Sequence, residues 1–394
     1  MTREAVIVAA SRTAVGKALK GTTAHARSDD MMATVVEELM GQTDGKLDPA
    51  LIDDLIVGCA MPESAQGLNF GRSIAMRAGL PVDVPGQTVN RFCSSGLQTI
   101  AMGAERIIAN GADVIIAGGA ETMSLVPMSG YRVSPNQWLV ENAPEIYMGM
   151  GYTAEQVADE WDVSREDMDQ FAYESHMKAA AATEKGIFKE EIVPFKFTEV
   201  VATANGPVEK EMVFDRDEHL RPQTTVEGLG KLRPVFRNGG RVTAGNSSPL
   251  SDGAAGVIIM ERGKAEELGL EPLAKFIGFQ VAGVRPEVMG VGPIKAVPKL
   301  LDRVGMTLDD IDIIELNEAF AAQALAVIRT LEMDPEKVNV NGGAIALGHP
   351  LGCTGSKLTV QLLNEMKRRD SKYGMVTMCI GGGMGAAGIF ENLQ

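Results

Sequence analysis

The feature of this sequence that most constrains its fold is an internal repeat. In both halves, apolar strand-like runs alternate with helical patterns, as they do in parallel β-α-β units. Four segments of the first half recur in the same order in the second: 47–57 as 308–314, 88–90 as 337–339, 114–119 as 375–383, and 253–256 as 385–388. A duplicated unit is the economical explanation of this order. We therefore expect an α/β protein with two copies of one β-α-β core.

The two copies differ by an insertion in the first. In the second copy the glycine pair and the Gly-Ala-Ala-Gly run nearly adjoin, whereas in the first they are separated by residues 120–252. This block holds both tryptophans and two expected helices, which open at Thr153 and Ser164 with capping-box patterns. We therefore expect three parts: an N-terminal core half formed by 1–119 and 253–270, an inserted loop domain at 120–252, and a C-terminal core half at 271–394.

Length and composition exclude several classes of protein. With 394 residues, of which 45% are hydrophobic, the chain can bury a large core, yet no run approaches the roughly 18 apolar residues of a membrane span. A net charge of −15 argues against nucleic acid or an anionic membrane as the main partner. The four cysteines are dispersed and match neither a disulfide framework nor a metal site. The cysteine spacing therefore leads us to expect no metal. The segment from Glu4 to Ala10 resembles a strand rather than a signal peptide, so we expect a cytoplasmic protein.

We expect the chemistry near Cys93. A short strand pattern from Gly86 to Asn90 meets a turn of small residues, and a helical pattern that is apolar nearly all round follows to Asn110. Cys93 would then lie beside the N-terminus of that helix, where free N–H groups and the helix dipole lower a thiol pKa and favour a reactive thiolate. A free cysteine is more commonly a small buried apolar residue, so position alone leaves both interpretations open.

Three further motifs follow expected strands in the last third of the chain. They are Asn317-Glu318-Ala319-Phe320 after 312–316, a Gly-rich loop with His349 after 338–341, and Cys379-Ile380-Gly381-Gly382-Gly383 after 375–378. Sites in open α/β sheets form at the carboxyl ends of strands, so these motifs should meet Cys93 there. A histidine between glycine and proline is otherwise more often structural. The loop also lacks the residue order of a P-loop.

A basic cluster stands out in the expected insertion. Between residues 221 and 241, five basic residues accompany the single acid Glu227: Arg221, Lys231, Arg233, Arg237 and Arg241. In so acidic a chain this cluster could bind phosphates, and a solvated surface is an equally good explanation. A loop with small hydroxyl side chains, 242–249, follows it and could meet the amides of a ligand.

Together these motifs resemble the thiolase family. The resemblance is carried by Val89 to Gly96, Asn317 to Phe320, Gly348-His349-Pro350 and Cys379 to Gly383, and it spans essentially the whole chain. It implies a duplicated, five-layered αβαβα core with an inserted loop domain. It also implies coenzyme A thioesters as substrates, coenzyme A itself as a substrate rather than a permanently bound cofactor, and a homodimer or homotetramer.

The resemblance assigns a role to each motif. Cys93 would be the nucleophile that attacks the 3-keto carbon, His349 its base, and Cys379 the acid that protonates the leaving enolate. His349 with a water held by Asn317 would stabilise one oxyanion, and the N–H groups of Cys93 and Gly381 the other. Coenzyme A contacts carried over by position are Arg221, Leu232, Ala244 and Ser248.

Two departures from the acetoacetyl-CoA-forming branch favour a degradative enzyme. Gly149 stands where that branch carries a histidine, and Gly228 stands where biosynthetic members tend to carry a serine. The resemblance therefore implies thiolytic cleavage of 3-ketoacyl-CoA to acetyl-CoA and a shortened acyl-CoA, as in fatty-acid β-oxidation, where a multienzyme partner is possible.

Three alternatives remain open at this point. The first is an acetyl-CoA acetyltransferase that makes or cleaves acetoacetyl-CoA. The second is a decarboxylating condensing enzyme, which would not need Cys379. The third is a non-catalytic protein that binds acyl-CoA or lipid and lacks an activated thiol.

Overall fold

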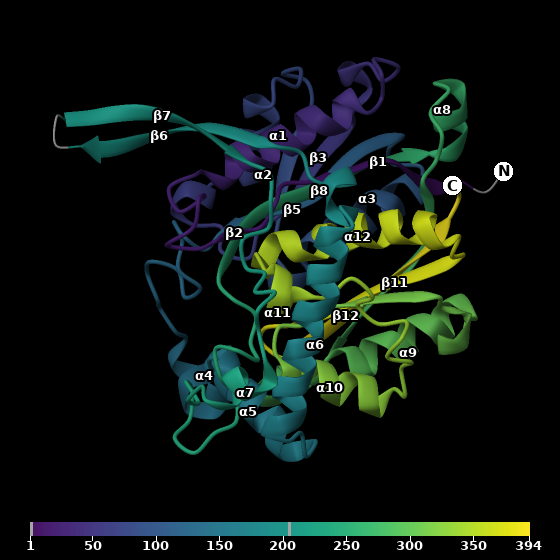
Figure 1. Cartoon of the computed structure of the whole chain (residues 1–394). Coiled ribbons are helices and arrows are strands. Elements are labelled where there is room, and N and C mark those ends of the chain that lie inside the picture. The colour runs from purple at the N-terminus through teal and green to yellow at the C-terminus, as the bar shows by residue number, and fades with distance from the viewer. Residues whose placement is uncertain (1–2, 204–205) are drawn as a thin grey trace.

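The computed structural model describes residues 3–203 and 206–394, and its centre is one mixed ten-stranded sheet (Figure 1). The first half contributes β1 (Ala5–Arg12), β2 (Gly16–Lys17), β3 (Asp54–Gly58), β4 (Gly86–Val89), β5 (Val114–Thr122) and β8 (Ser251–Glu261). The second half contributes β9 (Ala274–Gly283), β10 (Ile313–Leu316), β11 (Tyr373–Ile380) and β12 (Met384–Asn392). The strand order is β10-β11-β12-β9-β1-β8-β5-β3-β4, and β2 pairs with β8.

The pairing pattern confirms the predicted duplication. In the first half β3 is parallel to β5, which is antiparallel to β8, which is antiparallel to β1. In the second half β10, β11, β12 and β9 repeat this sequence of orientations, and β1 joins β9 at the centre. The expected strand at 338–341 is wrong, because Val338 makes only an isolated parallel bridge to Ile314, on the side of β10 where β3 has β4.

Helices of the two halves form the other layers. They are α1 (Ser28–Gly41), α2 (Phe70–Arg77), α3 (Ser95–Ile108) and α8 (Arg262–Glu267), then α9 (Pro293–Val304), α10 (Ala321–Thr330), α11 (Ala344–Leu347) and α12 (Leu351–Arg369). One buried cluster packs α1 and α2 on the first-half strands, and another packs α9 and α10 on the second-half strands. A third cluster holds α3 and α12 between the first-half strands and the second-half strands of the sheet. The two parts of the sheet therefore form two separate β-layers, and the order of layers is αβαβα.

Glycines allow the two central helices to approach closely. A Cβ at Gly96 of α3 would lie 2.6 Å from the backbone nitrogen of Ser356, and one at Gly355 of α12 would lie 2.2 Å from that of Leu97. Neither position can carry a side chain without displacing backbone. This close packing brings the N-termini of α3 and α12 together, and with them the segments around Cys93 and His349.

The insertion contains α4 (Gln137–Asn142), α5 (Met150–Glu160), α6 (Arg165–Glu184), β6 (Phe195–Thr203), β7 (Gly206–Phe214) and α7 (Val226–Gly230). The β6–β7 hairpin extends away from the body of the molecule, at the upper left of Figure 1. Ser164 caps α6 as predicted, because its Oγ accepts from the N–H of Asp167. The predicted helix start at Thr153 is wrong: α5 begins at Met150, and the Thr153 hydroxyl donates back to the Met150 carbonyl.

Candidate active site

Cys93 lies in a short 3-10 turn, Phe92–Ser94, between β4 and α3. Phe92 has a φ of 43°, which a bulky residue rarely adopts, and neighbouring side chains stabilise the turn. Asn90 Oδ1 accepts from the N–H of Phe92 at 2.9 Å, and the Ser95 hydroxyl donates to the Phe92 carbonyl at 2.7 Å. Cys93 is buried in a cluster that includes Leu351, at the start of α12.

Burial raises the pKa of the Cys93 thiol to about 12, although the N–H groups of Gly381 and of Cys93 itself lower it. The expectation that the helix terminus alone would lower this pKa is therefore wrong, because loss of water outweighs the local dipoles. Cys93 is therefore a thiol at rest, and a reaction at its sulfur would need a base.

His349 has the protonation state that such a base requires. The Thr354 hydroxyl donates to the Pro350 carbonyl at 2.9 Å, and its oxygen lies 2.5 Å from His349 Nδ1. We assign the single Thr354 proton to the Pro350 carbonyl, which places the ring proton on Nδ1 and leaves Nε2 unprotonated. Burial, and then the charge of Lys357, lowers the pKa of His349 to about 3, so the ring is neutral.

Asn317 follows β10 and is fully buried beside this histidine. Its Nδ2 lies 3.3 Å from His349 Nε2, and its Oδ1 has no hydrogen-bond partner among the described residues. The N–H of Asn317 donates to the Thr377 carbonyl of β11, which fixes the turn to the neighbouring strand. With Nε2 unprotonated, the Asn317 amide N–H donates to it, and the unpaired Oδ1 is the polar group left available for a ligand or a water.

Cys379 lies near the end of β11, and Gly381 directly follows the strand. Burial raises the pKa of the Cys379 thiol well above its usual value, and the nearby Cys93 raises it further. The N–H of Gly381 reaches the Cys93 thiol. The backbone turns sharply at Gly382 and Gly383, whose φ values of 79° and 87° are readily adopted only by glycine.

Three of the four residues expected to contact coenzyme A line the same cavity. Arg221, Leu232 and Ala244 line one cavity of about 140 Å³. Ser248 does not line it; its N–H and its hydroxyl both donate to the Ala319 carbonyl, beside the Asn317 turn. A cavity of about 380 Å³ elsewhere, next to Phe188, contains none of the expected residues.

The five basic residues of the cluster do not form a single binding site. Arg237 makes an ion pair with Asp159 at 2.6 Å, and Arg241 lies 3.7 Å from the same carboxylate. These two side chains stabilise the contact with α5. Of the five basic residues, Arg221 is the one that lines the cavity.

The comparisons with known proteins agree with this geometry. The family model described as thiolase, N-terminal domain, matches residues 5–263, and that described as thiolase, C-terminal domain, matches residues 270–392. The chain belongs to the thiolase family. It is 58% identical over 390 residues to a protein named 3-ketoacyl-CoA thiolase from Bacillus subtilis, with 99% of both chains covered. It is 45% identical over 397 residues to one named acetyl-CoA acetyltransferase from Pseudomonas aeruginosa, with 98% of both chains covered.

A solved structure extends the likeness to the fold. The crystal structure of the Bacillus anthracis acetyl-CoA acetyltransferase aligns with a TM-score of 0.89 at 40% identity, covering 100% of this chain and 99% of that one. This agreement confirms the thiolase fold that the repeat and the motifs predicted.

Two buried carboxylates beside this site have no role in the sequence analysis: Glu318, which lies within the Asn317 motif, and Glu121, which no motif includes. Glu318 accepts from Ser175, Asn339 and the N–H of Ile345, and it joins the Asn317 turn to α6 and α11. Glu121 accepts from the N–H groups of Ala60 and Gly352 and fixes the start of α12. A charged residue inside an apolar strand, such as Glu121 in β5, is the signal that could have found it.

Proposed function

We propose that this acyltransferase of the thiolase family cleaves 3-ketoacyl-CoA with coenzyme A, giving acetyl-CoA and a shortened acyl-CoA. The observation that carries the proposal is the meeting of two buried thiols, Cys93 and Cys379, with the Gly381 N–H at the first of them. His349, whose unprotonated Nε2 can accept a proton, completes the set. One thiol can hold an acyl group while the other handles a proton.

In the first half-reaction, the Cys93 sulfur attacks the 3-keto carbon and its proton passes to His349 Nε2. The bond between the α-carbon and the 3-keto carbon breaks, which leaves the acyl group on Cys93. The departing acetyl-CoA enolate takes the proton of Cys379. Because burial opposes both thiolates, each proton moves together with the bond change it serves.

In the second half-reaction, a second coenzyme A gives its thiol proton to the Cys379 thiolate. Its sulfur then attacks the acyl carbonyl, and the bond to Cys93 breaks. The Cys93 thiolate recovers the proton held by His349, so all groups return to their starting states.

The oxyanions of both steps need donors. The N–H groups of Cys93 and Gly381 point at the Cys93 sulfur, where the acyl oxygen would form. His349 Nε2 in its protonated form and the Asn317 side chain would serve the thioester oxygen. Removing one such donor typically costs ~10²–10³ in rate.

The acyl end of the site favours an apolar chain. A Cβ at Gly381 would meet the Phe92 ring at 3.5 Å and Met150 Sδ at 4.0 Å, and one at Gly382 would meet Ile146 at 3.4 Å. Acetyl-CoA acetyltransferase activity is the second candidate, because one of the relatives carries that name. The apolar wall and the glycine at 149 favour the longer substrates.

The same proposal includes the setting of the enzyme. We assign coenzyme A to the cavity at Arg221 within the inserted loop domain, 120–252, and the chemistry to the core halves, 1–119 with 253–270 and 271–394. A cytoplasmic homodimer or homotetramer, with a possible β-oxidation partner, fits the family. In the described residues no helix is long and apolar enough to cross a membrane.

Direct assay tests the function. Purified protein with a 3-ketoacyl-CoA and coenzyme A should release acetyl-CoA, and mass spectrometry of the protein mixed with an acyl-CoA should find the acyl group on Cys93. Iodoacetamide at neutral pH should label Cys93 stoichiometrically and abolish activity. An unreactive Cys93 with tight acyl-CoA binding would instead indicate a binding protein, and full activity of Cys379→Ala would indicate a condensing enzyme.

A further inference from the structure

The backbone of His349, the proposed base, is hydrogen-bonded to a pair of buried side chains that take no part in the proposed reaction. The N–H of His349 donates to the Ser251 hydroxyl at 3.0 Å, and this hydroxyl lies 3.0 Å from His219 Nε2. Ser251 opens β8, and His219 belongs to the insertion. Both side chains are buried, so their hydrogen bonds are not shared with bulk water.

The protons of this group can be assigned from the acceptors around it. The Ser251 hydroxyl lies 2.8 Å from the Pro249 carbonyl, and His219 Nε2 lies 3.1 Å from the Gly16 carbonyl. Carbonyl oxygens only accept, so we assign the Ser251 proton to Pro249 and the His219 ring proton to Nε2. This single Nε2 proton is shared between the Gly16 carbonyl and the Ser251 oxygen, and the Ser251 oxygen also accepts from the N–H of His349.

Packing restricts the same peptide. Gly348, which precedes His349, has a φ of 94°. A Cβ built there would lie 2.7 Å from the His219 ring, 2.7 Å from Ser251 Oγ and 2.7 Å from a methyl of Val15. The turn into His349 therefore fits against His219 and Ser251 with no space for a side chain.

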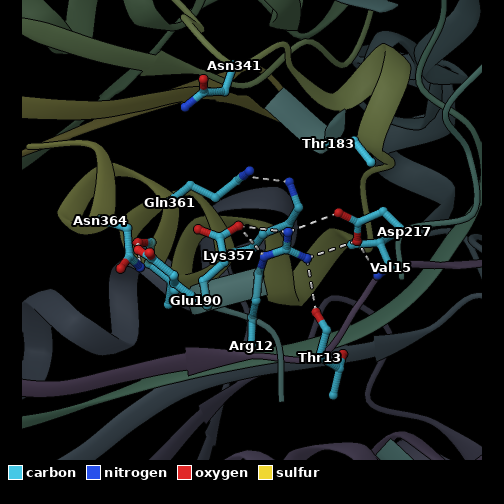
Figure 2. Close-up of polar contacts among 12 residues, drawn as sticks. Arg12, Thr13, Val15, Thr183, Glu190, Asp217, Asn341, Lys357, Gln361 and Asn364 are labelled. Atoms are coloured by element: carbon cyan, nitrogen blue, oxygen red, sulfur yellow. Dashed lines mark hydrogen bonds and ion pairs between the residues drawn. The ribbon is translucent and has the colours of Figure 1, made fainter. Parts of the chain in front are cut away.

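His219 is itself held firmly to the core. Two residues before it, Asp217 makes two hydrogen bonds of 2.9 Å to the buried Arg12 and accepts from the N–H of Val15 (Figure 2). Arg12 also pairs with the buried Glu191 at 2.7 Å. These contacts fix the backbone that leads to His219.

His219 also faces the cavity assigned to coenzyme A. It lines that cavity together with Arg221, Leu232 and Ala244. His176 lines it too, but its Nδ1 accepts from the N–H of Arg221 at 3.3 Å, and it has no hydrogen bond to Ser251 among those of the described residues. Two buried histidines thus line one cavity. Of these two, His219 is the one hydrogen-bonded to Ser251, which in turn accepts from the N–H of His349.

We propose that Ser251 and His219 are positioning residues, which hold the His349 peptide and so set the place of its ring, and which connect this peptide to the coenzyme A cavity. The inference rests on the proposed function for the identity of the reaction. Neither residue touches the reacting atoms. Their effect reaches the chemistry through His349, whose displacement by 1 Å could cost ~10² in rate.

The test compares removal of each contact with its conservative replacement. Ser251→Ala and His219→Leu should lower kcat about 10- to 100-fold and slow the alkylation of Cys93 by iodoacetamide by a similar factor. His219→Gln retains an N–H donor at the end of the side chain and should recover most of both rates. Thr43→Val removes an equally buried hydroxyl at the end of α1 and should leave both rates unchanged.

The outcomes separate this inference from the proposed function. Wild-type rates of alkylation and turnover in Ser251→Ala and His219→Leu would overturn the positioning role. If Ser251→Ala does not fold, the difference between His219→Gln and His219→Leu decides, and equal rates in those two variants would overturn it. If the wild-type protein does not cleave 3-ketoacyl-CoA but Ser251→Ala still slows alkylation, the substrate is wrong and the positioning role stands.

Discussion

His349 Nδ1 lies 2.5 Å from Thr354 Oγ1, five residues further along the chain in the first turn of α12. We assign the threonine hydroxyl proton to the Pro350 carbonyl, so that the oxygen accepts from the imidazole. With this assignment, the contact leaves Nε2 unprotonated, as the proposed base requires. The helix that packs the two halves together therefore also orients the His349 ring.

Thr354→Val should test this relationship. Loss of the acceptor allows the other tautomer and an altered ring orientation, so we expect kcat to fall by about 10²-fold, a loss typical of general-base catalysis. The KM for coenzyme A should change little, because Thr354 does not line the cavity. Thr354→Ser keeps the hydroxyl and should retain most of the activity. Equal losses in both variants would show that the packing of Thr354, rather than its hydrogen bond, determines the activity.

The two cysteines should fail at different steps. Cys93→Ala should form no acyl-enzyme, whereas Cys379→Ala should still accept an acyl group from a simple acyl-CoA and stop where the enolate needs a proton. Intact-protein mass spectrometry followed by peptide mapping distinguishes the two. An adduct on Cys379 instead of Cys93 would reverse the assignment.

Local patterns were sufficient to predict much of the core. The apolar runs of β5 and β11 and the helical pattern of α3 depend on residues close in sequence, and the structure has these elements within a few residues of their expected bounds. The failure at 338–341 has a long-range cause. Val338 makes only a bridge to Ile314, although its sequence matches that of a strand.

In the site, too, local features could be predicted from the sequence and long-range features could not. The motifs that hold Cys93, His349 and Cys379 are local and could be found from the sequence. The pKa of Cys93 could not, because it depends on burial by the whole fold. The contact of His219 with Ser251 joins positions 32 residues apart, and nothing in the sequence around either residue indicates it.

Arg221→Ala should raise the KM for coenzyme A several-fold and leave kcat nearly unchanged. A phosphate contact partly exposed to water contributes only ~1 kcal/mol, and it acts equally in ground and transition states. Steady-state kinetics with coenzyme A and with shortened thiols that lack the nucleotide would check this. Arg237→Ala is the matched control, because that side chain is engaged by Asp159. Equal losses with the shortened thiols would show that Arg221 is structural.

His176 should make the protein sensitive to acid. Burial, and then the charges of Arg221 and His219, lowers its pKa from 6.5 to about 4, so the unfolded chain binds its proton first as the pH falls. Between these values the contribution of His176 to the free energy of unfolding should fall by up to about 1.4 kcal/mol per pH unit. His176→Gln should therefore lose less stability than wild type between about pH 7 and pH 5 in urea titrations. Parallel curves for the two proteins would contradict the shift.

The wall near Gly381 leads to a prediction about the acyl chain. Phe92, Met150 and Ile146 surround the turn beside Cys93, and an unbranched methionine can repack around chains of several lengths. Each further buried methylene could add up to ~0.8 kcal/mol of binding until the space is filled. We therefore expect kcat/KM to be higher for medium-chain 3-ketoacyl-CoA than for acetoacetyl-CoA.

Two methionines provide a matched pair for testing this selectivity. Met150 lies near Gly381, whereas Met148 is 37% exposed. Met150→Ala should reduce kcat/KM for medium-chain substrates several-fold more than for acetoacetyl-CoA, since only the longer chains reach its side chain, and Met148→Ala should leave the ratio near that of wild type. The measurement is kcat/KM over a ladder of 3-ketoacyl-CoA lengths. A wild-type preference for acetoacetyl-CoA with longer chains excluded would make acetyl-CoA acetyltransferase the better assignment, because an apolar wall that bound the chain would have favoured the opposite order.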